Sequence, residues 1–377
     1  MTSTDTEQAR IGALRRTGDV VVVVAFAAII CAPMAFQLSE HKGIELVEKR
    51  TLASLPVRPN TLDAWAAFPA AADQYFGDRF GLRGELISTN SYLHYLLGIS
   101  ASPRVLVGSH GWLFYISDPQ FKFFRGRNQL SQEEIHNWIG QMEDRQRWLA
   151  ERQAKLVILP APLKETIYPE LLPYWLRRER ASTLVDQLVS AAAGHVPIVD
   201  VRNQLVHRKQ QASTYAPFDT HWNAEGAFVA YSALVQQFNR MGAALRPLTR
   251  EAVVLHATPP EHLQRDLVLM LGVHPFVKVD GFAYTPRSAA SGSKVEYLTA
   301  RTDANSPQIF RSGIPGTPTL MMVGDSFSMA LLPYLRDTFG TIIWMHLQDG
   351  FFPKQYMEKY HPDFVLMEVQ EGGLGVI

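Results

Sequence analysis

The stretch PTLMMVGDSFS, from Pro318 to Ser328, joins an uninterrupted apolar run to a polar turn that begins with glycine. A short run without polar alternation is typical of a strand that is buried on both faces of a parallel sheet. Ligands of such sheets bind beyond the carboxyl ends of the strands, where the following turn begins. The stretch therefore predicts an α/β fold, and it places Ser326 where chemistry is expected.

The same alternation of apolar strands and helices extends outward along the chain. Residues 241–316, rich in proline, threonine and glycine, interrupt it and predict an irregular or β-rich insertion. Ser131 and Glu134 have the spacing of a capping box at the start of a helix. Strands are predicted at 108–115, 155–160, 196–201, 318–324, 341–346 and 363–369, and helices within 62–97, 131–153, 181–193 and 327–339. Together they indicate a parallel sheet covered on both faces by helices.

Composition narrows the class of protein. The 377 residues are 47% hydrophobic and 19% charged, which is enough apolar material for a large core. Lys plus Arg equals Asp plus Glu at 36 each, and no basic block appears, so a nucleic-acid binder is not indicated. The single cysteine, Cys31, has no partner for an internal disulfide and lies in an apolar run, so no redox chemistry is implied.

That apolar run, Val20–Phe36, has seventeen residues without a charge and predicts a membrane anchor. Arg10, Arg15 and Arg16 precede it and favour a cytoplasmic amino end. A cleaved signal peptide is the alternative, although no clear small-x-small site closes the run. The predicted organisation is a cytoplasmic segment 1–18, a transmembrane signal anchor 19–38, a linker 39–61 and an extracytoplasmic domain 62–377.

A second motif, DTHW, supplies partners for Ser326. Asp219 and His221 are two residues apart in the loop before a helix that Asn223 is expected to cap. A serine hydroxyl is a weak nucleophile until a histidine takes its proton, and a carboxylate orients that histidine. Asp219, His221 and Ser326 therefore form a candidate catalytic triad.

Other interpretations of these motifs remain open. Asp219 and the GDS turn are also suited to capping helices, with His221 as an ordinary surface residue. A metal-dependent phosphoesterase also uses Asp-x-His, but it needs further ligands at strand ends, and the sequence offers no such segment. We therefore expect no metal and no cofactor.

The two motifs resemble the SGNH hydrolase fold. GDSFS resembles its nucleophile block, and DTHW resembles the Asp-x-His block of its circularly permuted relatives, the AlgJ and AlgX type of polysaccharide O-acetyltransferases. The resemblance covers nearly the whole chain from about residue 45, and the predicted anchor is closer to the AlgJ type. It implies a three-layer α/β/α domain in which Ser326 takes an acetyl group, His221 is the base and Asp219 orients it.

The resemblance also implies a substrate and partners. The acceptor would be an exported polysaccharide, alginate-like or another exopolysaccharide. A membrane-bound O-acyltransferase of the AlgI kind would supply acetyl to a protein in the bacterial inner membrane whose catalytic domain lies in the periplasm. Trp222, Lys164 and Tyr215 are candidates for substrate binding. The alternative is packing beside the triad for Trp222 and a solvated side chain for Lys164, while Tyr215 is near the site by sequence only. An acetylesterase with the same triad, and a non-catalytic scaffold of a secretion complex, remain the rival functions.

Overall fold

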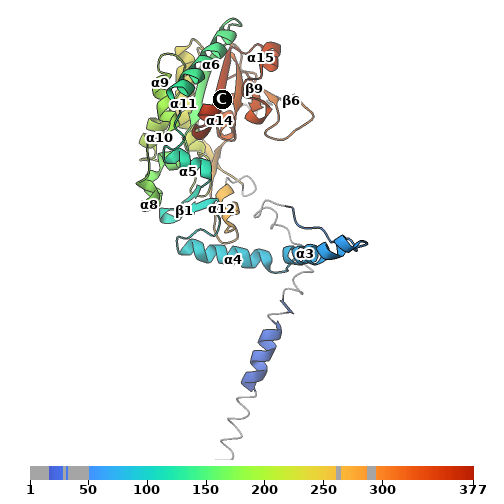
Figure 1. The fold of residues 1–377 in the computed structure, drawn as a ribbon. Coiled ribbons are helices and arrows are strands. Elements are labelled where there is room, and N and C mark those ends of the chain that lie inside the picture. Colours follow the sequence, from blue (N-terminus) through green and yellow to red (C-terminus); the bar gives the residue numbers. More distant parts are fainter. Residues whose placement is uncertain (1–16, 29–30, 33–50, 260–264, 287–293) are drawn as a thin grey trace, which may run out of the picture. The chain divides into compact units, whose positions relative to one another are not determined.

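The computed structural model describes residues 17–28, 31–32, 51–259, 265–286 and 294–377. Contacts divide the chain into two compact units, one formed by residues 1–97 and 269–277 and the other by 98–268 and 278–377. Helices α3 (Leu62–Asp78) and α4 (Arg83–Leu96), blue in Figure 1, belong to the first unit. The domain predicted at 62–377 includes both helices, and its boundaries stay a prediction.

The membrane anchor falls only partly within the described residues. Residues 17–28 are helical, and residues 29–30 and 33–36 of the apolar run lie outside the described part. Within the described part, none of the helices combines the length and the apolar character that a membrane crossing needs.

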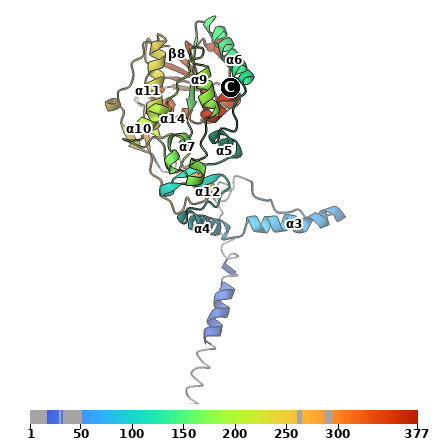
Figure 2. The ribbon, with the colours of Figure 1, turned by 60° about the vertical axis from the view of Figure 1, so that its left-hand side comes forward.

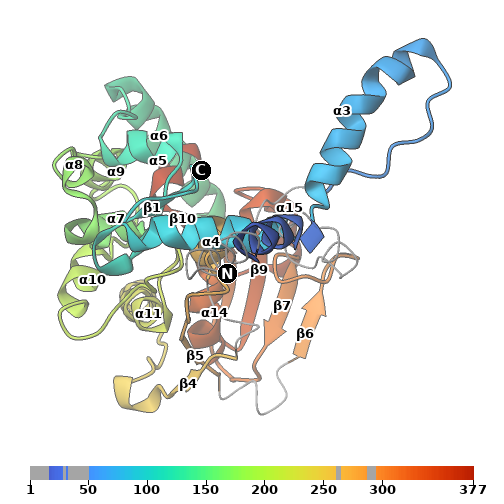
Figure 3. The same ribbon diagram turned by 90° about the horizontal axis from the view of Figure 1, so that it is seen from below.

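A six-stranded sheet organises the second unit. The order across the sheet is β3 (Lys155–Ala161), β10 (Phe364–Gln370), β8 (Thr319–Gly324), β9 (Thr341–His346), β7 (Gln308–Arg311) and β6 (Lys294–Tyr297). The first four strands in this order are parallel to each other. At the edge that Figure 3 shows in orange, β7 runs antiparallel to β9, and β6 runs antiparallel to β7. The α/β fold with a mainly parallel sheet is confirmed.

Helices cover both faces of this sheet. Successive residues of a strand point to opposite sides, and the strands here are apolar on both sides, so each face needs a layer of helices to bury it. In β8, Leu320 and Met322 pack into the cluster that contains α11 (Ala224–Arg240) and α14 (Ser328–Arg336). Met321 and Val323 pack into the cluster on the other face, with α6 (Gln132–Ala150), α9 (Leu184–Ala191) and α15 (Lys354–Tyr360). Figure 2 shows α11 and α6 on opposite sides of β8. The result is a three-layer α/β/α arrangement.

Two helix starts that the sequence predicts, those of α6 and α11, are present in the structure. The capping box at Ser131 and Glu134 is present at α6, and the Asn223 side chain accepts from the Gly226 N–H at the start of α11. The remaining elements of the second unit are short: β1 (Val105–Val107), β2 (Leu113–Tyr115), α5 (Asp118–Phe124), α7 (Lys164–Ile167), α8 (Tyr174–Arg177) and α10 (Arg202–Arg208).

The strand predicted at residues 196–201 is wrong. This segment makes a single parallel bridge, between Ile158 and Ile198, and is otherwise irregular. Pro197 has no N–H to donate to a ladder, and the chain enters α10 at Arg202. The segment therefore passes the edge of β3 without extending the sheet.

Of the two alternatives predicted for residues 241–316, irregular or β-rich, the described residues agree better with the second. Strands β4 (Leu255–Ala257) and β5 (Phe282–Tyr284) form a separate antiparallel pair, and α12 (Asp266–Leu271) lies between them in sequence. The last two strands of the segment, β6 and β7, complete the main sheet.

Candidate active site

The turn between β8 and α14 presents Ser326 at the carboxyl end of the sheet. Asp325 stabilises this turn, since its carboxylate accepts from the N–H of Phe327 at 2.9 Å and from the N–H of Gln370 at 2.7 Å. The second contact ties the turn to the end of the neighbouring strand β10. Ser326 itself is exposed.

A buried carboxyl lies beneath this turn. Glu368, fully buried on β10, accepts from the Ser328 hydroxyl at 2.5 Å and from the Asp325 N–H at 3.3 Å. Burial, and then the charge of Asp325, raise the pKa of Glu368 well above its ordinary value. Glu368 therefore supports the turn from below, in surroundings that favour its neutral form.

The loop before α11 brings the other two residues to Ser326. Asp219 is buried and accepts from the backbone N–H of His221 at 3.0 Å and from its Nδ1 at 2.6 Å. The opposite ring nitrogen, Nε2, lies 2.8 Å from the Ser326 hydroxyl. A carboxylate, an imidazole and a hydroxyl are thus connected in series, in the arrangement that activates a serine nucleophile.

The charges around His221 favour its protonated form. Burial alone would lower the pKa of His221, but the hydrogen bond and charge of Asp219 outweigh it, and Asp266 and Asp325 contribute in the same direction. The pKa of His221 is therefore raised above 6.5. Burial raises the pKa of Asp219, but the contacts with His221 lower it overall, so Asp219 remains ionised.

Sequence reasoning missed Asp266. Its carboxylate accepts from the Thr220 N–H at 3.0 Å and from the Thr220 hydroxyl at 2.7 Å. Its own N–H donates to the second carboxylate oxygen of Asp219 at 3.1 Å. Asp266 therefore holds the Asp219–His221 loop from behind. Asp266 lies at the start of a short helix inside the segment predicted as an insertion, and no local pattern there indicates this contact.

Asp219, His221 and Asp266 also have the ligand types of a metal site, with one ligand atom of each within 4.8 Å of the others. Their atoms already exchange hydrogen bonds with each other and with Thr220. Protein contacts alone therefore account for the cluster.

Lys164 lies behind the triad and offers nothing to a sugar. It is 1% exposed, and its ammonium donates to the backbone carbonyls of Ala216, Pro217 and Asp219 at 3.0, 3.2 and 2.5 Å. Burial lowers the pKa of Lys164 to about 7, although the charges of Asp219 and Asp266 oppose the shift. The substrate-contact role predicted for this lysine is replaced by one of holding the loop.

Trp222 and Tyr215 are also interior residues. Neither has exposed surface, and the two form an isolated bridge at the base of the loop. The Trp222 indole donates to the Phe327 carbonyl at 3.0 Å, and the Tyr215 hydroxyl donates to the Pro162 carbonyl at 2.5 Å. Stacking on a sugar needs an accessible ring face, and neither ring offers one. Trp222 therefore packs in the interior, the alternative given for it, and Tyr215 does the same.

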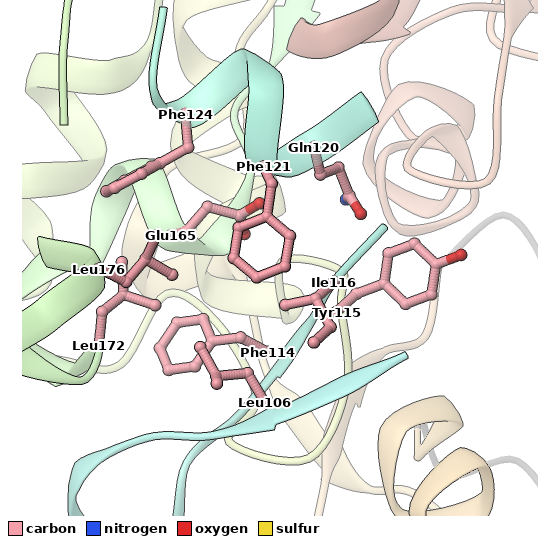
Figure 4. A pocket seen from close by; sticks show the side chains of 10 residues that line it. All are labelled: Leu106, Phe114, Tyr115, Ile116, Gln120, Phe121, Phe124, Glu165, Leu172 and Leu176. Atoms are coloured by element: carbon pink, nitrogen blue, oxygen red, sulfur yellow. The ribbon is translucent and has the colours of Figure 1, made fainter. Parts of the chain in front are cut away.

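A small cavity beside Lys164 contains a second buried carboxyl. Figure 4 shows Glu165 between Phe121 and Phe124, in a cavity of about 10 Å³. Burial raises the pKa of Glu165 to about 7, opposed by its own backbone hydrogen bond and by Lys164. The cavity has room for about one water molecule, which excludes it as a substrate site.

Comparison with known proteins agrees with this fold. Residues 105–363 match the family described as "SGNH hydrolase-like domain, acetyltransferase AlgX", which is more than half of the chain. The chain therefore belongs to this family.

Two curated relatives and one solved structure are similar. The "Probable alginate O-acetylase AlgJ" of Pseudomonas putida is 27% identical over 175 residues, 45% of this chain and 43% of the relative. The protein of the same name from Pseudomonas aeruginosa is 32% identical over 140 residues, 36% of this chain and 33% of the relative. The alignments thus span less than half of either relative. Bacillus cereus PatB1, solved with a sulfonyl adduct, shares the fold with a TM-score of 0.52 at 16% identity, over 72% of this chain and 97% of that one.

Proposed function

We propose that the protein is an extracytoplasmic O-acetyltransferase that moves acetyl groups onto hydroxyls of an exported polysaccharide. One observation carries the proposal: His221 Nε2 lies 2.8 Å from the hydroxyl of the exposed Ser326, while Asp219 occupies the other ring nitrogen. This arrangement suits acyl transfer through a covalent serine intermediate.

In the first step the Ser326 oxygen attacks the acetyl carbonyl of the donor, and His221 Nε2 takes the hydroxyl proton. Asp219 keeps Nδ1 protonated and stabilises the imidazolium that forms. Within the described residues the Ser326 N–H donates no hydrogen bond, so at the start of α14 it is available to the developing oxyanion. The imidazolium then protonates the leaving group.

In the second step a sugar hydroxyl attacks the acetyl-serine. His221 takes the proton of that hydroxyl, the bond between the acetyl carbon and the Ser326 oxygen breaks, and the proton returns to Ser326. The names of the two relatives, alginate O-acetylases, support an acetylation of polysaccharide.

The donor and the location complete the proposal. Acetyl-CoA is a cytoplasmic compound, so a membrane-bound acyltransferase of the AlgI kind would pass acetyl across the bilayer to Ser326. The apolar run Val20–Phe36 would anchor the chain in the bacterial inner membrane with its triad in the periplasm.

Loss of the triad tests the proposal. Ser326→Ala and His221→Ala should each lower turnover of a small activated acetyl ester by about three to six orders of magnitude, because the three residues act as a unit. Mass spectrometry of the wild type should find an added acetyl on the peptide containing GDSFS. Ser109→Ala, at an exposed serine elsewhere, should keep full activity. Full activity in a folded Ser326→Ala protein would remove the nucleophile and the proposal with it.

Hydrolysis is the second candidate function, because the exposure of Ser326 also admits water to the acyl-enzyme. Acetate release that no oligosaccharide reduces, with no acetylated sugar detected by mass, would identify an acetylesterase.

A further inference from the structure

A groove of about 580 Å³ in the second unit is lined by residues that lie close to the triad along the chain. One wall includes Met329 and Ala330, in the first turn of the helix that follows Ser326. The other includes Ala216 and Pro217, shortly before Asp219. Small-molecule sites typically have volumes of about 300–1,000 Å³. Both chain segments that carry the triad thus continue into the walls of a groove of suitable size.

Aromatic rings give this groove a rigid apolar surface. Tyr284 of β5 stacks on Tyr334 of α14, with ring centroids 4.6 Å apart and planes 2° apart. The Tyr334 hydroxyl donates to the Ala224 carbonyl at 2.8 Å, which fixes α14 to the start of α11. Phe282, at the edge, is 61% exposed. Flat rings of this kind can contact the C–H face of a pyranose, and the exposed ring of Phe282 is free to do so.

The charges in the groove suit a neutral ligand. The carboxylate of Glu225 pairs with Arg208 at 2.6 Å and Arg250 at 2.5 Å, and both arginines line a different pocket. Asp280 is the other charged side chain, and the described residues that line the groove include neither lysine nor arginine. A polyuronate carries one carboxylate per sugar, so it would meet the charge of Asp280 with no cation among the described residues that line the groove. Hydroxyls of a neutral sugar could donate to Asp280 and to Asn223.

We propose that this groove binds the acceptor, and that the acceptor is a chain of neutral sugars rather than of uronic acids. The inference rests on the proposed transferase function and adds the substrate class. The acceptor hydroxyl would reach Ser326 at the Met329 end of the groove, while neighbouring sugars lie along Tyr334 and Phe282. The bonds that form and break are those of the two acyl-transfer steps at Ser326, and no further reactant takes part.

A competition between two acceptors tests the substrate class. The full-length chain in detergent receives a small activated acetyl ester with equal concentrations of cellohexaose and of hexamannuronate. Acetylated sugar is counted by mass, and released acetate is measured in parallel. We expect at least about tenfold more acetyl on cellohexaose, which corresponds to about 1.4 kcal/mol. A preference for hexamannuronate would overturn the inference and leave the transferase function intact. Acetate release with neither sugar acetylated would instead overturn the transferase function, and the inference with it.

Variants of the groove test the place of binding. Phe282→Ala should raise the KM for cellohexaose by about tenfold. The matched control, Phe351→Ala, removes a partly exposed ring outside the groove lining and should leave that KM unchanged. Asp280→Lys should increase acetylation of hexamannuronate relative to cellohexaose by about tenfold, because it places a cation in the groove. Equal KM values for the two phenylalanine variants, or an unchanged ratio in Asp280→Lys, would show that the acceptor binds elsewhere.

Discussion

The ammonium of Lys164 is the partner of three backbone carbonyls in the loop that carries Asp219. In Lys164→Met these carbonyls stay buried without a donor, at a cost of about 1–3 kcal/mol for each group left unpaired. We therefore expect the free energy of unfolding, measured with urea, to fall by about 2–5 kcal/mol. Ester turnover in the protein that remains folded should fall as well, because the loop positions the triad.

Lys155 provides the matched control for Lys164. It is the exposed first residue of β3, the strand whose other end leads to Lys164, and its ammonium also donates to a backbone carbonyl, that of Met241. Lys155→Met should change the free energy of unfolding by less than about 1 kcal/mol and leave turnover unchanged. Equal effects of the two substitutions would show that Lys164 has no special relation to the triad.

Asp266 should control the pH dependence of the reaction. The base must be neutral, so ester turnover rises as the pH rises through the pKa of His221, which is raised from its ordinary value. The charge of Asp266 contributes to that raised pKa. Asp266→Asn keeps an acceptor for Thr220 and removes the charge, so the pKa of His221 should fall. The acid limb of the pH profile of kcat/KM should therefore move to lower pH.

The measurement is a profile of kcat/KM for a small acetyl ester from about pH 5 to about pH 9. Asp144→Asn, on an exposed part of α6, should keep the wild-type limb. A limb that stays in place, or that moves to higher pH, in Asp266→Asn would mean that Asp266 does not act on His221.

At the scale of elements, the turn from β8 to α14 depends on the close approach of β10. A Cβ at Gly324 would lie 2.1 Å from the Ser328 hydroxyl oxygen and 2.8 Å from a carboxylate oxygen of Glu368. Both side chains are fully buried, so the strand or the turn must move. Gly324→Ala should therefore lower ester turnover by about a hundredfold or more, since a displacement of about 1 Å at a catalytic group has effects of that size.

Gly140 of α6 is the control for this substitution, because a Cβ there meets nothing within 4 Å. Gly140→Ala should raise the free energy of unfolding by up to about 1 kcal/mol through helix propensity, and turnover should not change. Thermal unfolding and ester turnover of both variants provide the comparison. Wild-type turnover in Gly324→Ala would show that the turn tolerates movement.

At the scale of the whole molecule, the predicted anchor and the triad belong to different parts of the chain. If the run Val20–Phe36 spans the bilayer, the full-length protein should stay in the membrane fraction after washing with high salt, because salt screens charges and does not extract apolar segments. A chain that begins at residue 51 should be released. Full-length protein in the soluble fraction, with a new amino terminus near residues 36–40, would show cleavage.

The sequence by itself determined the strands of the parallel sheet, the start of α11 and the two motifs. These features depend on local patterns: uninterrupted apolar runs, a capping residue, and the spacing of Asp219 and His221. The strand predicted at residues 196–201 is wrong because an apolar run indicates only that a segment is buried. It does not indicate that the segment pairs with a neighbouring strand.

Only the tertiary structure decided what surrounds the motifs. The hydrogen bond from His221 to Ser326 joins residues 105 positions apart, and that from Asp266 to Asp219 crosses 47. Whether Lys164 meets solvent or three carbonyls depends on which loop covers it. The groove is likewise built from segments that no local pattern relates. Contacts of this kind arise from the packing of distant segments, so they become visible only when the chain is folded.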